Sequence, residues 1–310
     1  MGLQIVATGS ALPEKYISNQ DLEKYLDTTD EWIVERTGIR KRHIADKEND
    51  EETIASLGAL ASKRALEMAN MEAEEIDLIL AATCSSDKKL PCLACQIQEK
   101  LPGCKAAAFD IGAACSGFLI ALSVAEGYLR SGAFKNILVV GAEVLSSLVD
   151  YNDRSTCILF GDGAGACIVK ASDSPFYFSL GADGSGGQAL YCEDNKKIMM
   201  NGQDVYRFAT RVVPKVIKET IEKAEMTAED VDIYFLHQAN ERIIKSIARN
   251  LGEAEDKFPM NLSEVGNMSS ASIPVLLDEW NREGKIPKGS RLMLAGFGAG
   301  LTFGSSVICW

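Results

Sequence analysis

The chain has 310 residues, 46% of them hydrophobic and 25% charged, which is the composition of a globular protein with a sizeable core. Its 32 Lys and Arg against 44 Asp and Glu give a formal net charge of −12 at pH 7. Proteins that bind nucleic acids or membranes by releasing counterions carry a basic excess, so this charge excludes a generic binder of polyanions. An anionic partner would need a local basic patch.

The N-terminus has the pattern of a folded domain from its first residues. The sequence MGLQIVATGS leads directly into a strand-like segment, with no basic region or cleavage site before it. No run of about 18 uncharged apolar residues occurs in the chain. We therefore expect a cytoplasmic protein that binds neither membranes nor nucleic acids.

The sequence contains nine cysteines, at 84, 92, 95, 104, 115, 157, 167, 192 and 309. An odd, dispersed set is unlike the disulfide framework of a secreted domain, so most should be buried, reduced and inert. Cys92 and Cys95 form a CxxC motif. Because no second cysteine pair or histidine cluster accompanies it, the sequence favours a structural role over metal or redox chemistry, and we predict no metal site.

Two pairs of segments match at one offset. Residues 69–82 and 224–237 both contain a helical run followed by an apolar strand, and they align residue for residue with an offset of 155. Residues 135–141 and 290–296 are apolar strands that end at a glycine, at the same offset. Since half of 310 is also 155, the chain has the pattern of one unit built twice.

Helices alternate with short, continuously apolar strands, a pattern typical of parallel strands covered by helices on both faces. We therefore predict an α/β fold of two halves, 1–170 and 171–310, connected through the turn formers at 171–178. The halves should form one rigid body, with the functional site where equivalent loops of both meet.

Residues 109–130 predict a strand, a turn of small residues and an apolar helix, with Cys115 at the turn. A thiol at a helix start lies near free backbone N–H groups and the positive end of the helix dipole, which would lower its pKa. The same N–H groups could bind an oxyanion. On these residues alone, packing as a small hydrophobic side chain is the commoner role.

The chain has only two histidines. His43 is flanked by cations in the segment 39–44, which disfavours its protonated form, and we expect it near the surface. His237 ends the apolar strand 231–237, at the carboxyl edge where α/β sheets place ligand sites. A hydrogen-bonded structural histidine is the alternative there.

The segment 264–274 is a turn of small polar residues that leads into a helix-like run. The offset of 155 places Ser270 opposite Cys115, so Asn267 lies in the counterpart of the cysteine's own turn. The repeat therefore brings Cys115, His237 and Asn267 towards one point. Asn267 could equally be a left-handed turn residue, its commonest role beside a glycine.

Two glycine-rich strings, 160–166 and 296–304, lack the spacing of a dinucleotide fingerprint and the Gly-Lys-Ser/Thr of a phosphate loop. Neither predicts a nucleotide cofactor. Residues 296–300 end a strand, where a backbone N–H offered to a bound carbonyl and simple tight packing are equally open.

In their order and spacing, these motifs resemble those of the β-ketoacyl-acyl carrier protein synthase III condensing enzymes. The resemblance rests on C-S-G-F from Cys115, H-Q-A-N from His237, G-N-M-S-S-A-S from Gly266, G-A-G-L-T-F-G-S from Gly298, and the segment 27–40. It spans the whole chain. It implies the thiolase fold, with five α–β–α–β–α layers built from two similar halves, and a homodimer.

The resemblance implies a decarboxylative Claisen condensation that starts fatty-acid or related polyketide-type synthesis. An acyl group would pass from acyl-CoA to Cys115 and accept a carbanion formed from malonyl-acyl carrier protein. His237 and Asn267 would donate hydrogen bonds to the enolate oxygen, and the N–H groups of Cys115 and Ala299 would bind the tetrahedral intermediates. A glycine is more usual at Ala299. CoA is a substrate in this scheme, and no cofactor is implied.

The resemblance also implies which residues bind the substrates. Five would line the CoA tunnel, from adenine to pantetheine: Trp32, Arg154, Arg36, Asn240 and Gln203. Four cations would receive the acidic carrier, three of them at helical spacing: Arg207, Arg242, Lys245 and Arg249. Without the family, Trp32 has the pattern of a core residue and the basic stripe that of a solvated helix face.

Two positions depart from the family pattern. Leu90 lies where an aromatic residue is common, in a loop that in the family reaches the partner's acyl pocket, and Gln203 replaces a common Asn. The changed pocket floor and the neighbouring Lys88 and Lys89 leave a longer, branched or polar primer open. The alternatives are a hydrolase or non-condensing acyltransferase with the same acyl-cysteine, and a non-catalytic binding homologue.

Overall fold

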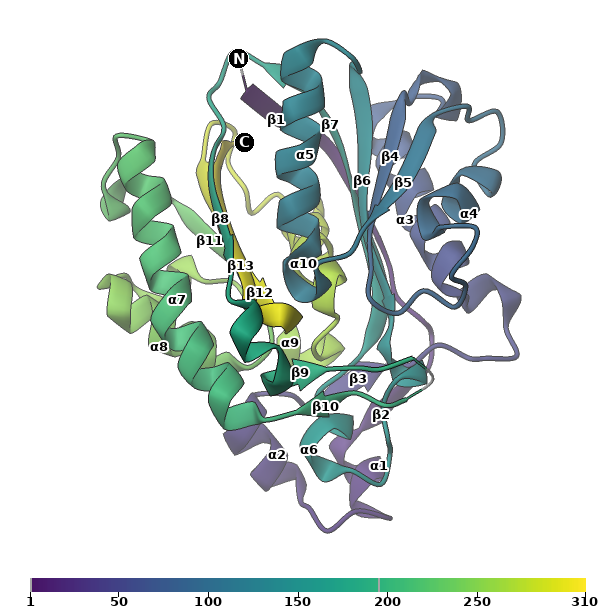
Figure 1. Ribbon diagram of the computed structural model, residues 1–310, viewed down its shortest axis with the longest axis vertical. Helices are drawn as coiled ribbons and strands as arrows, with labels where there is room; N and C mark the ends of the chain where they lie inside the picture. The colour runs from purple at the N-terminus through teal and green to yellow at the C-terminus, as the bar shows by residue number, and fades with distance from the viewer. Residues whose placement is uncertain (1, 195) are drawn as a thin grey trace.

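The computed structural model describes residues 2–194 and 196–310. Two sheets face each other, with helices between them and on both outer sides (Figure 1). The molecule therefore has five layers, α–β–α–β–α, and the predicted fold class is confirmed.

The first sheet has the strand order β1 (Gly2–Ala11), β7 (Asp162–Ser172), β6 (Asn136–Val144), β4 (Leu78–Ala82), β5 (Ala107–Ile111). Its outer face is covered by α3 (Ile54–Ala69) and α4 (Leu93–Glu99). β4 runs parallel to β5 and β6, whereas β7 is antiparallel to both of its neighbours. β5 lies at the edge of this sheet.

The second sheet has the order β11 (Ile233–Leu236), β12 (Arg291–Gly298), β13 (Thr302–Cys309), β8 (Tyr177–Ala182). Its outer face is covered by α7 (Gly202–Lys223), against which α8 (Glu241–Leu251) packs. β11 and β12 are parallel, but β13 is antiparallel to β12 and β8. The expectation of parallel strands is therefore confirmed for β11 and β12 but wrong for β13, because the connection between β12 and β13 is too short for a crossover.

The predicted repeat is present in the elements themselves. β4 and β11, β6 and β12, and the helices α5 (Gly117–Ser131) and α10 (Ser272–Arg282) each begin 155 residues apart. α5 and α10 both lie between the sheets and share one buried apolar cluster with them. The division of the chain at 1–170 and 171–310 stays a prediction.

Smaller elements close one end of the layers (Figure 1, bottom): β2 (Tyr16–Ser18), α1 (Asn19–Glu23), α2 (Asp30–Thr37), β3 (Lys41–His43), α6 (Arg154–Cys157), β9 (Leu190–Tyr191), β10 (Met199–Met200), α9 (Leu262–Val265). The fully buried Arg42 of β3 connects β2, α1 and the end of α6, since its guanidinium donates hydrogen bonds to the carbonyls of Ile17 and Ile158 and to Asn19 Oδ1. His43 is half-buried, and its Nδ1 lies 2.7 Å from the carbonyl of Pro13.

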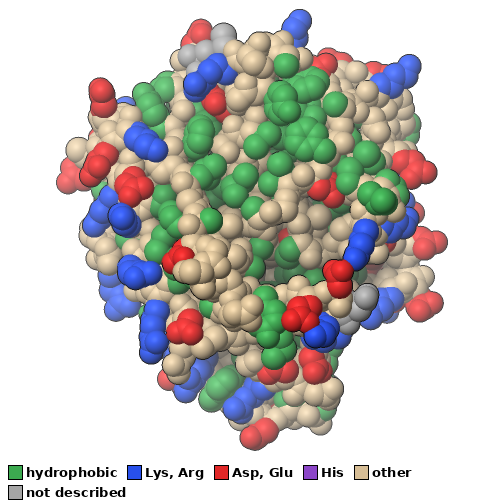
Figure 2. All heavy atoms as spheres, viewed as in Figure 1, with side chains coloured by type: hydrophobic (Ala, Val, Ile, Leu, Met, Phe, Trp, Pro, Cys, Tyr) green, Lys and Arg blue, Asp and Glu red, His purple; other side chains and the backbone are tan. Residues whose placement is uncertain are grey.

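All nine cysteines are free, and only Cys115, Cys157 and Cys167 are buried. The expectation that most would be buried is therefore wrong. None of the helices within the described ranges has the length and hydropathy that a membrane crossing requires. In Figure 2, acidic and basic side chains are interspersed, and hydrophobic side chains gather over the upper parts of α5 and β5.

Candidate active site

Cys115 lies in a single 3-10 turn, Ala114–Ser116, between β5 and α5. Ala114 has a φ of 45°, in the left-handed region, so the chain bends sharply there and places the thiol at the start of the helix. The counterpart turn, Ser269–Ala271, precedes α10 and bends at Ser269 with a φ of 47°. The two turns lie against each other, as the repeat predicts.

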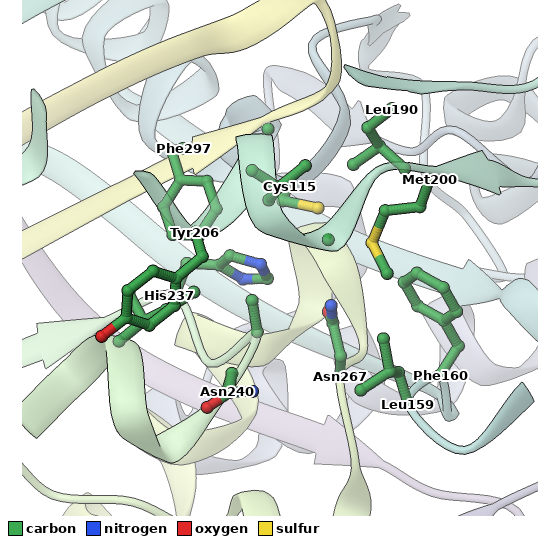
Figure 3. A pocket seen from close by; sticks show the side chains of 15 residues that line it. Cys115, Leu159, Phe160, Leu190, Met200, Tyr206, His237, Asn240, Asn267 and Phe297 are labelled. Carbon is green, nitrogen blue, oxygen red and sulfur yellow. The ribbon is translucent and has the colours of Figure 1, made fainter. Parts of the chain in front are cut away.

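Cys115, His237 and Asn267 line one cavity of about 90 Å³ (Figure 3). His237 continues the strand ladder of the second sheet, because its N–H donates to the carbonyl of Ala295 at 2.8 Å. The rest of the wall is largely apolar and includes Leu159, Phe160, Leu190, Met200, Val205, Tyr206, Ile243 and Phe297. The three residues that the repeat brings together therefore meet in the structure.

The amide of Asn267 has a fixed orientation. Its Oδ1 accepts the N–H of Ser269 at 2.9 Å, which leaves the NH₂ group free to donate. Its backbone bonds to the carbonyl of Leu159 and the N–H of Gly161, at 2.8 and 3.0 Å. The left-handed positions of this loop are Gly266 and Ser269, so Asn267 is not the turn residue that the alternative assumed.

Burial sets the protonation of the cavity. Burial lowers the pKa of His237 to about 3, and a hydrogen bond with the backbone of Ser269 opposes this shift, so the imidazole is neutral at pH 7. Burial raises the pKa of Cys115 to about 12, opposed by the hydroxyl of Ser269. The expected lowering by the helix start is therefore wrong for the free protein. The cavity holds a neutral thiol beside an imidazole that keeps one N–H donor and one lone pair.

We expect His237 to destabilise the folded protein as the pH is lowered below about 6.5. The ordinary pKa of an unfolded histidine is about 6.5, so between pH 6.5 and 3 the unfolded chain binds a proton that folded His237 does not. The free energy of unfolding then falls by about 1.4 kcal/mol per pH unit through this group. Urea unfolding at pH 7 and 5 should show the difference between wild type and His237→Gln changing by about 2 kcal/mol. A difference that stays constant between pH 7 and 5 would contradict this.

A second cavity of about 200 Å³ also includes Cys115 in its wall. Most of its other residues are apolar: Ala114, Leu145, Leu148, Phe160, Leu190, Ile198 and Ala299, with Cys84, Tyr191, Cys192 and Ser269. Next to Ala299, a Cβ on Gly298 would lie 2.7 Å from the backbone nitrogen of Cys115. Glycine therefore allows the loop that carries Ala299 to pack against the backbone of the cysteine.

Leu90 lies outside both cavities, and 86% of its surface is exposed. Its role in a partner's acyl pocket stays a prediction. Lys88 and Lys89 line neither cavity, and Lys89 Nζ forms an ion pair with Asp194 Oδ2 at 2.6 Å. These lysines therefore give no support to a polar primer.

An open groove of about 740 Å³ adjoins the first cavity, with which it shares Leu159, Met200, Gly202, Tyr206 and Asn240. All five residues predicted to bind CoA line it: Trp32, Arg36, Arg154, Gln203 and Asn240. The guanidinium carbons of Arg36 and Arg154 lie 5.1 and 4.7 Å from the centroid of the Trp32 ring. Trp32 is therefore half-buried in a cationic wall and is not a core residue.

Asn240 has a structural task at the mouth of the cavity. It caps α8, since its Oδ1 accepts the N–H of Arg242 at 2.8 Å, and its Nδ2 donates to the carbonyl of Arg36 at 2.8 Å. Because both ends of its amide are engaged, Asn240 holds α8 against α2. Its contact with pantetheine stays a prediction.

Of the four cations predicted to receive a carrier protein, two line the groove. Arg207 and Arg242 line the groove, whereas Lys245 and Arg249 lie further along α8. Arg207 and Lys245 form ion pairs with acidic neighbours on their own helices, at 3.4 and 2.6 Å. Only part of the predicted basic stripe therefore faces the groove.

Sequence reasoning missed Glu143, a fully buried carboxylate in β6. It accepts hydrogen bonds from Thr83 Oγ1 (3.1 Å), the Cys84 N–H (3.1 Å), Ser85 Oγ (2.5 Å) and Ser270 Oγ (2.8 Å). The signal in the sequence is one Glu inside an apolar strand. Within the described part of the chain, no cluster of His, Cys, Asp or Glu is placed to hold a metal ion.

Comparison with known proteins places these features in one family. Family models match residues 109–184, described as 3-oxoacyl-[acyl-carrier-protein (ACP)] synthase III, and residues 221–310, described as the C terminal of the same synthase. A β-ketoacyl-[acyl-carrier-protein] synthase III of Clostridium acetobutylicum is 45% identical, over 99% of this chain and 98% of the relative.

Solved structures agree with the sequence comparison. A 3-oxoacyl-[acyl-carrier-protein] synthase III from Aquifex aeolicus VF5 superposes with a TM-score of 0.96 and 42% identity over 100% of both chains. The priming β-ketosynthase of the R1128 polyketide biosynthetic pathway superposes with a TM-score of 0.93 and 36% identity, covering 99% of this chain and 96% of that one.

Proposed function

The chain belongs to the 3-oxoacyl-[acyl-carrier-protein] synthase III family, and we propose that it performs its priming condensation through an acyl intermediate on Cys115. It is a condensing acyltransferase with the thiolase fold that acts at the start of fatty-acid synthesis. One observation carries the proposal: Cys115, His237 and Asn267 line a cavity that adjoins a groove with a cationic aromatic wall.

In the first step, an acyl-CoA lies in the groove with its nucleotide on the wall formed by Trp32, Arg36 and Arg154. The Cys115 sulfur attacks the thioester carbonyl as its proton passes to the neutral imidazole of His237. The N–H groups of Cys115 and Ala299 stabilise the tetrahedral oxyanion. The carbon–sulfur bond to CoA then breaks, the CoA thiolate takes the proton, and the acyl chain occupies the second cavity.

In the second step, malonyl-acyl carrier protein replaces CoA. Loss of carbon dioxide leaves an enolate, whose oxygen accepts hydrogen bonds from the imidazole N–H of His237 and the NH₂ group of Asn267. The enolate carbon attacks the acyl carbonyl, and the bond from that carbon to the Cys115 sulfur breaks. The released thiolate then takes up one proton from solvent, which regenerates the thiol. The neutral imidazole suits this step because its N–H group can donate a hydrogen bond to the enolate oxygen without placing a positive charge in the buried cavity.

The primer is an apolar acyl group, because the second cavity is lined mainly by Leu145, Leu148, Leu190 and other apolar side chains. The carrier docks at the mouth of the groove through Arg207 and Arg242, with Lys245 and Arg249 beyond it.

We propose that the enzyme is a cytoplasmic homodimer. β5 is an edge strand, and the half-buried rings of Phe109, Tyr128 and Phe134 form edge-to-face contacts beside it, with centroids 6.3 and 5.2 Å apart. The hydrophobic side chains of Figure 2 gather over this side of the molecule. Sedimentation of the intact protein should give the mass of a dimer.

Intact-mass spectrometry tests the proposal. The protein is incubated with acetyl-, isobutyryl-, hexanoyl- and succinyl-CoA, and peptide mapping locates any adduct. We expect an adduct on Cys115 with apolar primers and little with succinyl-CoA. The absence of any adduct would overturn the proposal. Products with and without malonyl-acyl carrier protein separate condensation from hydrolysis, since a hydrolase would release the free acid in both cases.

We expect Trp32→Ala to raise the KM for acyl-CoA with little change in kcat. Stacking of a base on an aromatic ring contributes about 1–3 kcal/mol, which corresponds to a KM increase of roughly 5- to 150-fold. Steady-state kinetics at saturating malonyl-acyl carrier protein measure this. Tyr16→Ala is a matched control, since this ring lies near Lys41 Nζ (4.9 Å) but outside the groove. Equal KM values for Trp32→Ala and wild type would show that Trp32 does not contribute to CoA binding.

A further inference from the structure

The two cysteines of the CxxC motif face each other at the start of α4. The sulfur atoms of Cys92 and Cys95 lie 3.4 Å apart, and both residues are free and half-buried. A disulfide requires about 2.05 Å between the sulfurs and Cβ atoms about 4 Å apart, so small side-chain rotations close the remaining distance. The pair can therefore bond without refolding of the backbone.

Asp110 of β5 leaves Cys92 available for this contact. Cys92 occupies the N-cap position of α4, where a side chain usually accepts hydrogen bonds from the first N–H groups of the helix. Here the carboxylate of Asp110 accepts them, from Leu93 and Ala94 at 2.8 Å each. The Cys92 thiol makes no capping bond and lies against Cys95. Asp110 thus replaces Cys92 as the side chain that caps α4, and the Cys92 sulfur contacts the Cys95 sulfur instead.

We propose that Cys92 and Cys95 form a reversible disulfide, a modification site separate from the reaction centre at Cys115. A metal is the other use of a CxxC motif, but no third His, Cys, Asp or Glu in the described residues completes a metal-binding group with this pair. The proposal does not depend on the proposed function, because neither cysteine lines the cavities around Cys115 or the CoA groove.

The oxidant that the geometry suits is a small disulfide such as oxidised glutathione. The thiolate of one cysteine attacks the disulfide, one glutathione leaves with a proton, and a mixed disulfide remains. The second cysteine attacks the protein sulfur of that mixed disulfide, and the second glutathione leaves with the other proton. Two S–H bonds and one S–S bond are broken, and one S–S bond and two glutathione thiols are formed.

The surroundings predict a slow exchange. The neighbouring Cys92 thiol, burial and the charges of Cys92 and Asp110 all raise the pKa of Cys95, so little thiolate is present near pH 7. The bond would tie the end of the loop that carries Leu90 to the first turn of α4. Oxidation would therefore restrict the segment that the family resemblance assigns to the acyl pocket of a partner subunit.

Thiol trapping on the intact protein tests the proposal. The protein is equilibrated in mixtures of reduced and oxidised glutathione, acidified, labelled with N-ethylmaleimide and digested with trypsin. Cleavage after Lys89 and Lys100 gives one peptide, 90–100, that contains both cysteines. We expect an unlabelled peptide two hydrogen atoms lighter than the dithiol, which grows with the oxidised fraction and disappears with dithiothreitol. At any fixed ratio, its equilibrium share over the dithiol should be at least tenfold higher than in the same protein unfolded in urea.

Matched variants separate the outcomes. Cys92→Ser keeps a good N-cap residue and should lose the lighter peptide, while Cys104→Ser, at a half-buried cysteine outside the motif, should retain it. The proposal is overturned if both cysteines are labelled at every ratio, if a glutathione adduct persists on one of them, or if the folded and unfolded proteins give equal shares.

Discussion

Replacing Cys115 with Ala will abolish the acyl-enzyme, whereas Asn267→Ala will leave acylation nearly intact and block decarboxylation of the malonyl group. Loss of a nucleophile typically lowers the rate by a factor on the order of 10⁶. Loss of one oxyanion donor costs on the order of 10²- to 10³-fold. The two effects differ in kind because the sulfur forms the covalent bond, while the Asn267 NH₂ group stabilises charge only in the second step.

The two steps are measured separately, by intact mass after a pulse of acyl-CoA and by release of labelled carbon dioxide from malonyl-acyl carrier protein. Asn267→Asp is the sharper variant. Its carboxylate can still accept the N–H of Ser269, so the loop is retained while the donor is lost. We expect it to acylate and fail to decarboxylate, as Asn267→Ala does. If either Asn267 variant lost both steps equally, the division of roles would be wrong.

Glu143→Ala should destabilise the protein by about 3 kcal/mol or more, because each buried donor left without its acceptor costs about 1–3 kcal/mol. The substitution removes the acceptor for two hydroxyls of the first half, one backbone N–H and the hydroxyl of Ser270. These donors are buried or partly buried and would lose their partner. The loss should also disturb Cys115, because Glu143 holds Ser270 in the turn that packs against the turn of the cysteine.

Urea unfolding of wild type, Glu143→Ala and Glu143→Gln measures this. Glu143→Gln should fall between the other two, since its one carbonyl oxygen retains some of the bonds. The control is Glu222→Ala on the exposed side of α7, which should change stability by less than about 0.5 kcal/mol. A change below about 1 kcal/mol for Glu143→Ala would show that the network contributes little.

The sequence predicts the repeated architecture because apolar periodicity depends on local burial, and burial recurs in both halves. It does not predict strand direction equally well. β13 is as apolar as the parallel strands, and the short connection from β12 decides that it runs antiparallel. The direction of β7 has no such signal, because the 17 residues between β6 and β7 would also be long enough for a crossover.

The site shows the same division between local and tertiary information. The offset locates Cys115, His237 and Asn267, because equivalent turns in a repeat occupy equivalent places. It does not give the protonation of Cys115, since burial of the thiol depends on the walls that both halves supply. Glu143 and Arg42 escape detection for a related reason: both belong to residue types that usually lie at the surface, and only the assembled fold shows that their partners are buried polar groups.

The two halves use one equivalent position, Cys115 in the first and Ser270 in the second, for different purposes. Ser270 corresponds to Cys115, yet its hydroxyl lies 2.8 Å from both Glu143 Oε1 and the carbonyl of Ala82, and only 1% of its surface is exposed. The same bend thus holds a reactive atom in one copy and an anchor for the opposite copy in the other. A thiol introduced at Ser270 would lie buried against β4 and β6 of the first sheet, with no access to substrate. At this one position of the repeat, the first half supplies the nucleophile and the second half supplies a structural hydroxyl, while His237 and Asn267 reach the same cavity from other positions of the second half.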